Sequence, residues 1–209
     1  MPFRENLTDI YENYIKKPLE QEGHVVKRAD DIFKSSPIME DVIHQIKISD
    51  VIIADLTGKN PNVFYELGRA HEANKFVIQI SQQDHLPFDT RHIRTILYTD
   101  NPEGYGFLTE NLKKYVKTIQ KELQINEIID KLEESKEYVE AILYSKLISE
   151  WEEELSPRQI NKVAEAAYDN PQVFESYRAR EYLQPLFKKY ISIIPNNIIR
   201  HLEYNGYKF

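Results

Sequence analysis

The chain has 209 residues, of which 41% are hydrophobic and 29% are charged, and its formal net charge is -7 at pH 7. These values leave room for one α/β domain and a smaller second unit, and they exclude an intrinsically disordered chain. The acidic balance argues against general nucleic-acid binding, and the absence of cysteine excludes disulfides, thiolate metal sites and a cysteine nucleophile.

No apolar run approaches the roughly 18 residues that a membrane helix needs, and the N-terminus lacks the basic and apolar stretches of a signal peptide. We therefore expect a cytoplasmic protein that does not bind membranes. The six histidines show no metal-ligand spacing, so neither a metal nor another cofactor is implied. Small-molecule chemistry is the expected class of function.

The first half of the chain alternates between helical and strand patterns. Helices are expected at about 6–22, closed by Gly23, at about 63–74, and after a turn at Gly104-Tyr105-Gly106. Another helix is marked by Ile38, Val42, Ile43 and Ile46 after Ser35-Ser36-Pro37. Strands are expected at about 24–28, 50–55, 76–80 and 95–98. This alternation predicts a parallel, doubly wound sheet.

The order of these elements lacks the central first strand of a flavodoxin-like sheet, in which the first strand lies between the second and third. The chain opens on Met1-Pro2-Phe3 and enters its first helix almost at once. Either the chain begins at an internal methionine, with the native start upstream, or residues 1–3 form a very short first strand. We favour the first explanation.

From about residue 118 onward, only helical patterns occur. We therefore expect an α/β domain over 1–120 and an all-helical accessory domain over 121–209. Ser156-Pro157 and Asn170-Pro171 each combine an N-cap residue with proline at the first helical position, and each predicts a helix start. Pro185 and Pro195 are expected to divide the remainder into short helices.

The segment 50–70 carries the candidate site. A short apolar run bounded by acidic residues reads as a buried strand that ends at Asp55, and a helix follows with Glu66 expected in its first turn. Ligands of parallel sheets bind at the carboxyl ends of the strands. We therefore expect the two carboxylates to converge on one crevice.

The motif Tyr65-Glu66-Leu67-Gly68-Arg69-Ala70, with an acidic residue eleven positions before the glutamate, resembles the nucleoside 2-deoxyribosyltransferase-like superfamily. That superfamily includes nucleotide N-glycosidases and is related in fold to TIR-type NAD-cleaving domains. The resemblance covers about residues 1–117. It implies that Glu66 is the nucleophile at the anomeric carbon and that Asp55 is the supporting acid. It also implies a homo-oligomer, because subunits of this superfamily often share active-site residues.

The chemistry of the two residues is consistent with this role. Cleavage of an N-glycosidic bond builds positive charge on the sugar, which an ionised carboxylate stabilises or traps. The helix dipole is expected to keep Glu66 ionised, and a neighbouring carboxylate is expected to raise the pKa of Asp55 so that it protonates the leaving base. The alternative is that both residues only cap the turn and the helix.

Further candidates surround this pair. Asn60 and Asn62 lie where backbone N–H groups of a helix start hold an anion, although Asn62 serves equally well as a plain N-cap. Tyr65 belongs to the same motif and is a substrate-binding candidate. The loop is poorer in serine and glycine than in nucleotide-hydrolysing relatives, which leaves a monophosphate substrate in doubt.

Two more loops follow strand ends, and a third stretch is basic. Asp30 is a candidate for binding ribose hydroxyls, and Ser81, with Gln82 and Gln83, follows the strand at 76–80. Arg91 is a candidate for binding phosphate, with a surface salt bridge as the alternative. Solvated loops are the alternative for the first two.

The expected function is cleavage or transfer of the N-glycosidic bond of a nucleoside, a nucleotide or an NAD-type substrate. The alternative is a non-catalytic module that binds a nucleotide signal in the same crevice, with the helical domain relaying it to a partner.

Overall fold

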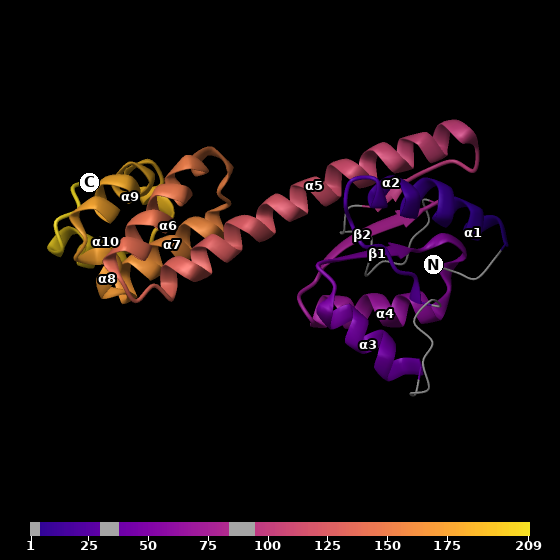
Figure 1. The fold of residues 1–209 in the computed structure, drawn as a ribbon, viewed down its shortest axis with the longest axis horizontal. Helices are drawn as coiled ribbons and strands as arrows, with labels where there is room; N and C mark the ends of the chain where they lie inside the picture. Colours follow the sequence, from indigo (N-terminus) through magenta and orange to yellow (C-terminus); the bar gives the residue numbers. More distant parts are fainter. Residues whose placement is uncertain (1–4, 30–37, 84–94) are drawn as a thin grey trace. The chain divides into compact units, whose positions relative to one another are not determined.

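The computed structural model describes residues 5–29, 38–83 and 95–209. Contacts between residues divide the chain into two compact units, Met1–Ile119 and Gln120–Phe209. The first unit is mixed α/β and the second is helical (Figure 1). The long helix α5 (Pro102–Glu133) contributes its first half to the first unit and its second half to the other.

The first unit is built on a small parallel sheet. Its strands are β1 (Val51–Asp55), β2 (Phe76–Ser81) and β3 (Thr95–Leu97). They lie in the order β1-β2-β3, with Asp55 paired with Ile80 and Ser81 paired with Leu97. The predictions of parallel strands at these three positions are confirmed, and the strand ends meet at one edge.

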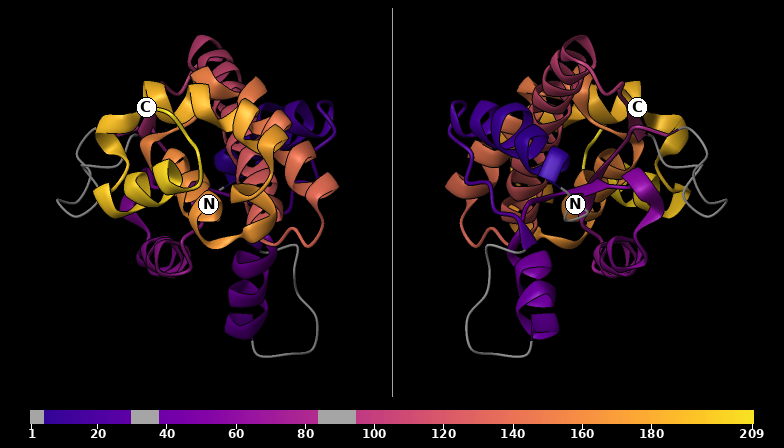
Figure 2. Two further views of the ribbon diagram at one scale, coloured as in Figure 1. Left: turned by 90° about the vertical axis from the view of Figure 1, so that its left-hand side faces the viewer. Right: turned by 90° about the vertical axis from the view of Figure 1, so that its right-hand side faces the viewer.

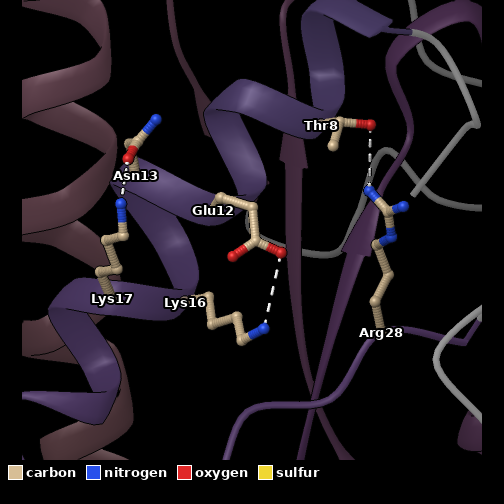
Figure 3. Close-up of polar contacts among 6 residues, drawn as sticks. All are labelled: Thr8, Glu12, Asn13, Lys16, Lys17 and Arg28. Atoms are coloured by element: carbon tan, nitrogen blue, oxygen red, sulfur yellow. Dashed lines mark hydrogen bonds and ion pairs between the residues drawn. The ribbon is translucent and has the colours of Figure 1, made fainter.

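The predicted strand at 24–28 is wrong, because these residues are not part of any strand. Val25 is 85% exposed, so the apolar pair Val25-Val26 does not supply a buried strand face. The segment is held to the first helix instead. The Arg28 guanidinium donates to Thr8 Oγ1 over 3.3 Å (Figure 3). It also lies 5.0 Å from the centre of the Tyr11 ring.

The predicted first helix is present as three consecutive segments. These are α1 (Glu5–Ile10), the π-helical segment η1 (Tyr11–Lys16) and α2 (Lys17–Glu20). As predicted, Gly23 closes it, with a φ of 90° that glycine adopts without strain. Pro18 has no N–H for the Tyr14 carbonyl four residues earlier, and Thr109 Oγ1 of α5 donates to that carbonyl over 2.7 Å.

The outer face of this helix is polar. Lys16 pairs with Glu12 at 3.5 Å, and Lys17 donates to Asn13 Oδ1 over 2.7 Å (Figure 3). Each pair is four residues apart, which places both partners on the same side of a helix. The apolar side, with Leu7, Ile10, Ile15 and Leu19, is buried.

Helices cover both faces of the sheet. Helices α3 (Ile38–Ile48) and α4 (Pro61–Glu72) lie on one side, and α1, α2 and the first half of α5 lie on the other (Figures 1 and 2). Helix α4 packs Val63 and Leu67 against Ala54, near the end of β1, and Leu56, which directly follows the strand. This contact fixes the start of α4 beside the carboxyl edge of the sheet.

The predicted turn at Gly104-Tyr105-Gly106 is wrong, because α5 already begins at Pro102. Gly104 is helical for a steric reason. A Cβ at this position would lie 2.1 Å from the Thr99 carbonyl oxygen, so only glycine allows the helix to start this close to the end of β3. A Cβ at Gly106 would meet nothing within 4 Å.

The second unit consists of short helices around one core. Besides the second half of α5, its helices are α6 (Tyr138–Glu150), α7 (Pro157–Asp169), α8 (Pro171–Phe174), α9 (Tyr177–Lys189) and α10 (Asn196–Tyr204), with 3₁₀ turns η5 (Glu152–Glu154) and η6 (Ile191–Ile193). The core includes the fully buried side chains Ile129, Leu132, Leu183 and Phe187.

Capping residues start two of these helices as predicted. Ser156 Oγ accepts the N–H of Gln159, and Asn170 Oδ1 accepts the N–H of Gln172. Asn170 also uses its amide nitrogen, which donates to the Leu132, Glu133 and Ser135 carbonyls and to Ser135 Oγ at 2.9 to 3.1 Å. This one side chain therefore ties the start of α8 to the end of α5.

Pro185 does not divide a helix, contrary to prediction, because it lies inside α9. Proline in a helix interior costs about 3 kcal/mol. The cost is offset by the neighbouring side chains Leu183, Leu186 and Phe187, which are fully buried. Pro195 does precede a helix, as predicted. Among the described helices, none has both the length and the apolar character needed to cross a membrane.

Candidate functional site

Asp55 is the last residue of β1, and its carboxyl is almost fully buried, with 1% of the residue exposed. Oδ1 accepts the backbone N–H of Thr57 over 2.9 Å. Oδ2 is buried and has no hydrogen-bond partner among the residues that the structure describes. A buried acceptor without a partner is costly, so this oxygen is an exception that calls for a ligand or a functional explanation.

The turn after Asp55 is held rigidly against the next strand. Residues Thr57–Lys59 form a 3₁₀ turn, in which Gly58 and Lys59 have φ values of 73° and 53°. Thr57 Oγ1 accepts the N–H of Gln82 over 3.1 Å, and Leu56 N–H donates to the Ile80 carbonyl over 2.9 Å. The ends of β1 and β2 are thus bonded to each other around Thr57.

Tyr98 comes from the end of β3 and completes this corner. Its backbone N–H donates to the Ser81 carbonyl over 3.0 Å, and only 4% of the residue is exposed. The side chains of Thr57 and Gln82 lie beside its hydroxyl, but neither reaches it with hydrogen-bond geometry. Within the described part of the chain, the Tyr98 hydroxyl and Gln82 Nε2 are buried without partners, as is Asp55 Oδ2.

The electrostatics of the corner reflect this burial. Burial raises the pKa of the Asp55 carboxyl, and the hydrogen bond from Thr57 opposes that shift. The pKa of Tyr98 is also raised, first by burial and then by the negative charge of Asp55. The expected cause of the Asp55 shift, a neighbouring carboxylate, is therefore replaced by desolvation.

Glu66 lies in the second turn of α4, not in the first, because the helix begins at Pro61, two residues before the predicted start. Asn60 is the N-cap. On an ideal helix Glu66 lies roughly 40° from Ala70 and 60° from Val63, both buried, so it borders the face that packs on the sheet. Side chains tilt toward the N-terminus of their helix, and the N-terminus of α4 lies at the carboxyl edge of the sheet.

The pKa of Glu66 shifts in the direction opposite to the one that a helix dipole produces. The helix dipole was expected to keep it ionised, but burial raises the pKa of its carboxyl above the ordinary value. The dipole acts within the first turn, and Glu66 lies beyond it. Desolvation by the packed helix face is therefore the larger effect.

The other candidates differ in how the structure uses them. Asn60 Oδ1 accepts the Asn62 N–H over 2.9 Å as the N-cap, while Asn62 is an exposed helical residue. Tyr65 is 51% exposed. Ser81 is buried, and its Oγ bonds both the N–H and the carbonyl of Gln83, so it shapes the loop after β2.

Asp30 and Arg91 lie outside the described residues. Sequence reasoning missed Thr57 and Tyr98. Tyr98 had a readable signal, because it directly follows β3 just as Asp55 ends β1, and polar groups at strand ends of parallel sheets are site candidates. The hydroxyl of Thr57 had no such signal.

No protein-family model matches the chain, and neither a curated protein nor a solved structure is significantly similar to it. Among the described residues, no group of three or more histidine and acidic side chains is placed to bind a metal ion. The corner formed by Asp55, Thr57, Gln82 and Tyr98 is therefore the candidate site on physical grounds alone.

Proposed function

We propose that the first unit cleaves or transfers the N-glycosidic bond of a nucleoside, a nucleotide or an NAD-type substrate. Glu66 is the nucleophile and Asp55 is the acid in this proposal. The observation that carries it is the state of Asp55, a carboxyl at the carboxyl edge of a parallel sheet with a raised pKa and one unpartnered oxygen.

Asp55 suits proton donation. A raised pKa keeps the carboxyl protonated at a higher pH than an exposed aspartate, and general acids work best when their pKa approaches the working pH. The bond from Thr57 to Oδ1 fixes the carboxyl and leaves Oδ2 for a leaving base. Burial destabilises the ionised form of the Asp55 carboxyl and thereby makes this carboxyl suitable as a general acid.

Glu66 suits covalent attack in a different way. Its oxygen bonds to the anomeric carbon, the electrons of the carbon–nitrogen bond pass to the base, and Asp55 supplies the proton that the base takes up. Water or a second base then attacks the same carbon and displaces the Glu66 carboxylate, and the ionised Asp55 takes up the proton that the attacking molecule loses. Partial burial leaves the Glu66 carboxylate poorly solvated, and a poorly solvated carboxylate is more reactive once it is ionised.

The sheet is compatible with a flavodoxin-like order, which we include in the proposal. In that order the three strands correspond to the third, fourth and fifth, and they are neighbours in sequence order, as observed. The site then lies where nucleotides bind in such folds.

A second candidate is a nucleotide-sensing module. The observation that favours it is the second unit, which has its own buried core and shares the continuous helix α5 with the first. In this reading ligand binding at the Asp55 corner alters how the helical unit engages a partner, and neither carboxyl needs to react.

Mass spectrometry distinguishes the enzyme from the sensing module. The full chain is incubated with a panel of nucleosides, nucleotides and NAD, and the products are analysed. The enzyme proposal expects free base from at least one substrate, and none with Glu66→Gln. Glu72→Gln is the matched control, because Glu72 lies on the same helix, is exposed and pairs only with Arg69 among the described residues. Intact substrates with the wild-type chain would refute cleavage and leave the sensing module.

A further inference from the structure

We propose that Tyr98 and Gln82 recognise the leaving base through its carbonyl and ring-nitrogen acceptors. This inference rests on the proposed function for the identity of the ligand. It concerns residues that the glycosidic chemistry itself does not require. The group recognised is a planar, neutral heterocycle, as in an oxo-purine, a pyrimidine or nicotinamide.

Three buried polar atoms at the corner lack partners among the described residues, and all three can donate a hydrogen bond. The Tyr98 hydroxyl carries one donor, Gln82 Nε2 carries two, and Asp55 Oδ2 donates when its carboxyl is protonated. They lie around Thr57, whose N–H donates to Asp55 Oδ1 and whose Oγ1 accepts the N–H of Gln82. A ligand that satisfies all three must present several acceptors close together.

Charge selects among such ligands. A phosphate group has the acceptors, but burying its charge beside Asp55, Gln82 and Tyr98, none of which is cationic, is costly. A sugar hydroxyl accepts few bonds and must also donate. Carbonyl oxygens and ring nitrogens of a base accept without carrying charge, so they fit a donor-rich, anion-poor corner best.

The free protein bears a cost for keeping these donors unpaired. Removal of a buried hydroxyl that has no hydrogen-bond partner should not destabilise the fold. Removal of a hydroxyl that makes a structural hydrogen bond should lower the free energy of unfolding. Tyr98→Phe is therefore expected to leave the fold at least as stable as the wild type. A loss of ligand binding without a loss of stability identifies a recognition residue.

The chain offers a matched control. Tyr207 in the second unit is also buried, with 2% exposed, and its hydroxyl likewise has no partner among the described residues. Tyr207→Phe makes the same chemical change at a similarly buried position of the other unit.

Binding of free hypoxanthine, uracil, nicotinamide, adenine and inorganic phosphate to the full chain is measured by calorimetry. We expect at least one of the three carbonyl-bearing bases to bind, and Tyr98→Phe and Gln82→Met each to raise its dissociation constant about tenfold or more. Tyr207→Phe is expected to leave it unchanged. The carbonyl-bearing base that binds most tightly shows whether the leaving group of the substrate is a nucleobase or nicotinamide.

The experiment distinguishes a refutation of this inference from a refutation of the enzyme proposal. Binding that is equal in wild type and Tyr98→Phe, binding of phosphate alone, or no binding of any base overturns the inference, even if cleavage occurs. Base binding that depends on Tyr98 in a chain that cleaves nothing supports the recognition surface and refutes the enzyme.

Discussion

Asp55→Asn is expected to stabilise the folded first unit at neutral pH. Asparagine has the same shape, and its Oδ1 can still accept the Thr57 N–H that now bonds at 2.9 Å. The substitution removes a buried carboxyl that has one unpartnered oxygen among the described residues. Leaving such a group unsatisfied costs about 1 to 3 kcal/mol.

The expected gain lies near the lower end of that range, because the new amide nitrogen also has no fixed partner. We expect on the order of 1 kcal/mol, which corresponds to a rise in Tm of about 2 to 4 °C for a chain of this size. Loss of activity together with a gain of stability is the pattern of a group retained for function.

The gain depends on pH with a definite sign. Burial raises the folded-state pKa of Asp55 above its ordinary value of 3.8, so the folded protein holds this proton more tightly than the unfolded chain. Below pH 3.8 both states are protonated and ionisation costs nothing. The advantage of Asp55→Asn therefore grows as pH rises from 3.8 through the folded-state pKa, and it is constant above that.

The assay must report on the first unit. Trp151, the only tryptophan, lies in the second unit, so its fluorescence serves as the internal reference. Hydrogen exchange of β1 and β2 at pH 4 and pH 7.5 gives the opening free energy of the sheet. Asp50→Asn, at an exposed aspartate just before β1, is the control. A destabilised Asp55→Asn, or a gain equal at both pH values, would refute the reasoning.

Three further predictions test other parts of the molecule. Gly104→Ala should destabilise the first unit by about 1 to 3 kcal/mol through backbone overlap, whereas Gly106→Ala should stabilise it by about 0.5 to 1 kcal/mol; equal effects in urea unfolding followed by circular dichroism would contradict this. Asn170→Ala should cost the second unit about 2 kcal/mol or more, because buried carbonyls lose their donor; an unchanged midpoint by Trp151 fluorescence would count against it. Any glycosidase activity should follow a bell-shaped pH profile. Its acid limb should lie above pH 4.5, because the pKa of Glu66 is raised above that value. Full activity below pH 4 would exclude Glu66 as an ionised nucleophile.

Local signals predicted the elements that depend on neighbouring residues. The caps at Ser156 and Asn170 and the apolar run that ends at Asp55 are each contained in a few residues, and the structure has each where the sequence placed it. The start of α4 was set two residues too late because Pro61 was not used as its first position, although Asn60-Pro61 is the same kind of start signal as Asn170-Pro171.

The elements that were predicted wrongly have conformations that depend on tertiary contacts. Gly104 reads as a turn residue, but its lack of a Cβ serves a close approach to Thr99 within a helix. Pro185 reads as a helix breaker, but the fully buried Leu183 and Phe187 outweigh its cost. The burial of the side chains beside Pro185 and the close approach of Thr99 to Gly104 are set by tertiary packing, which the types of the surrounding residues do not specify.

Unpartnered buried atoms do not mark a site by themselves. Ser145 Oγ and the Tyr207 hydroxyl in the second unit also lack partners among the described residues. The Asp55 corner differs because its three such atoms come from the ends of all three strands and lie around one residue, Thr57, whose bonds hold the loops in place. A bound molecule can pair all three at once, and the carboxyl edge of a parallel sheet is where such a molecule is expected.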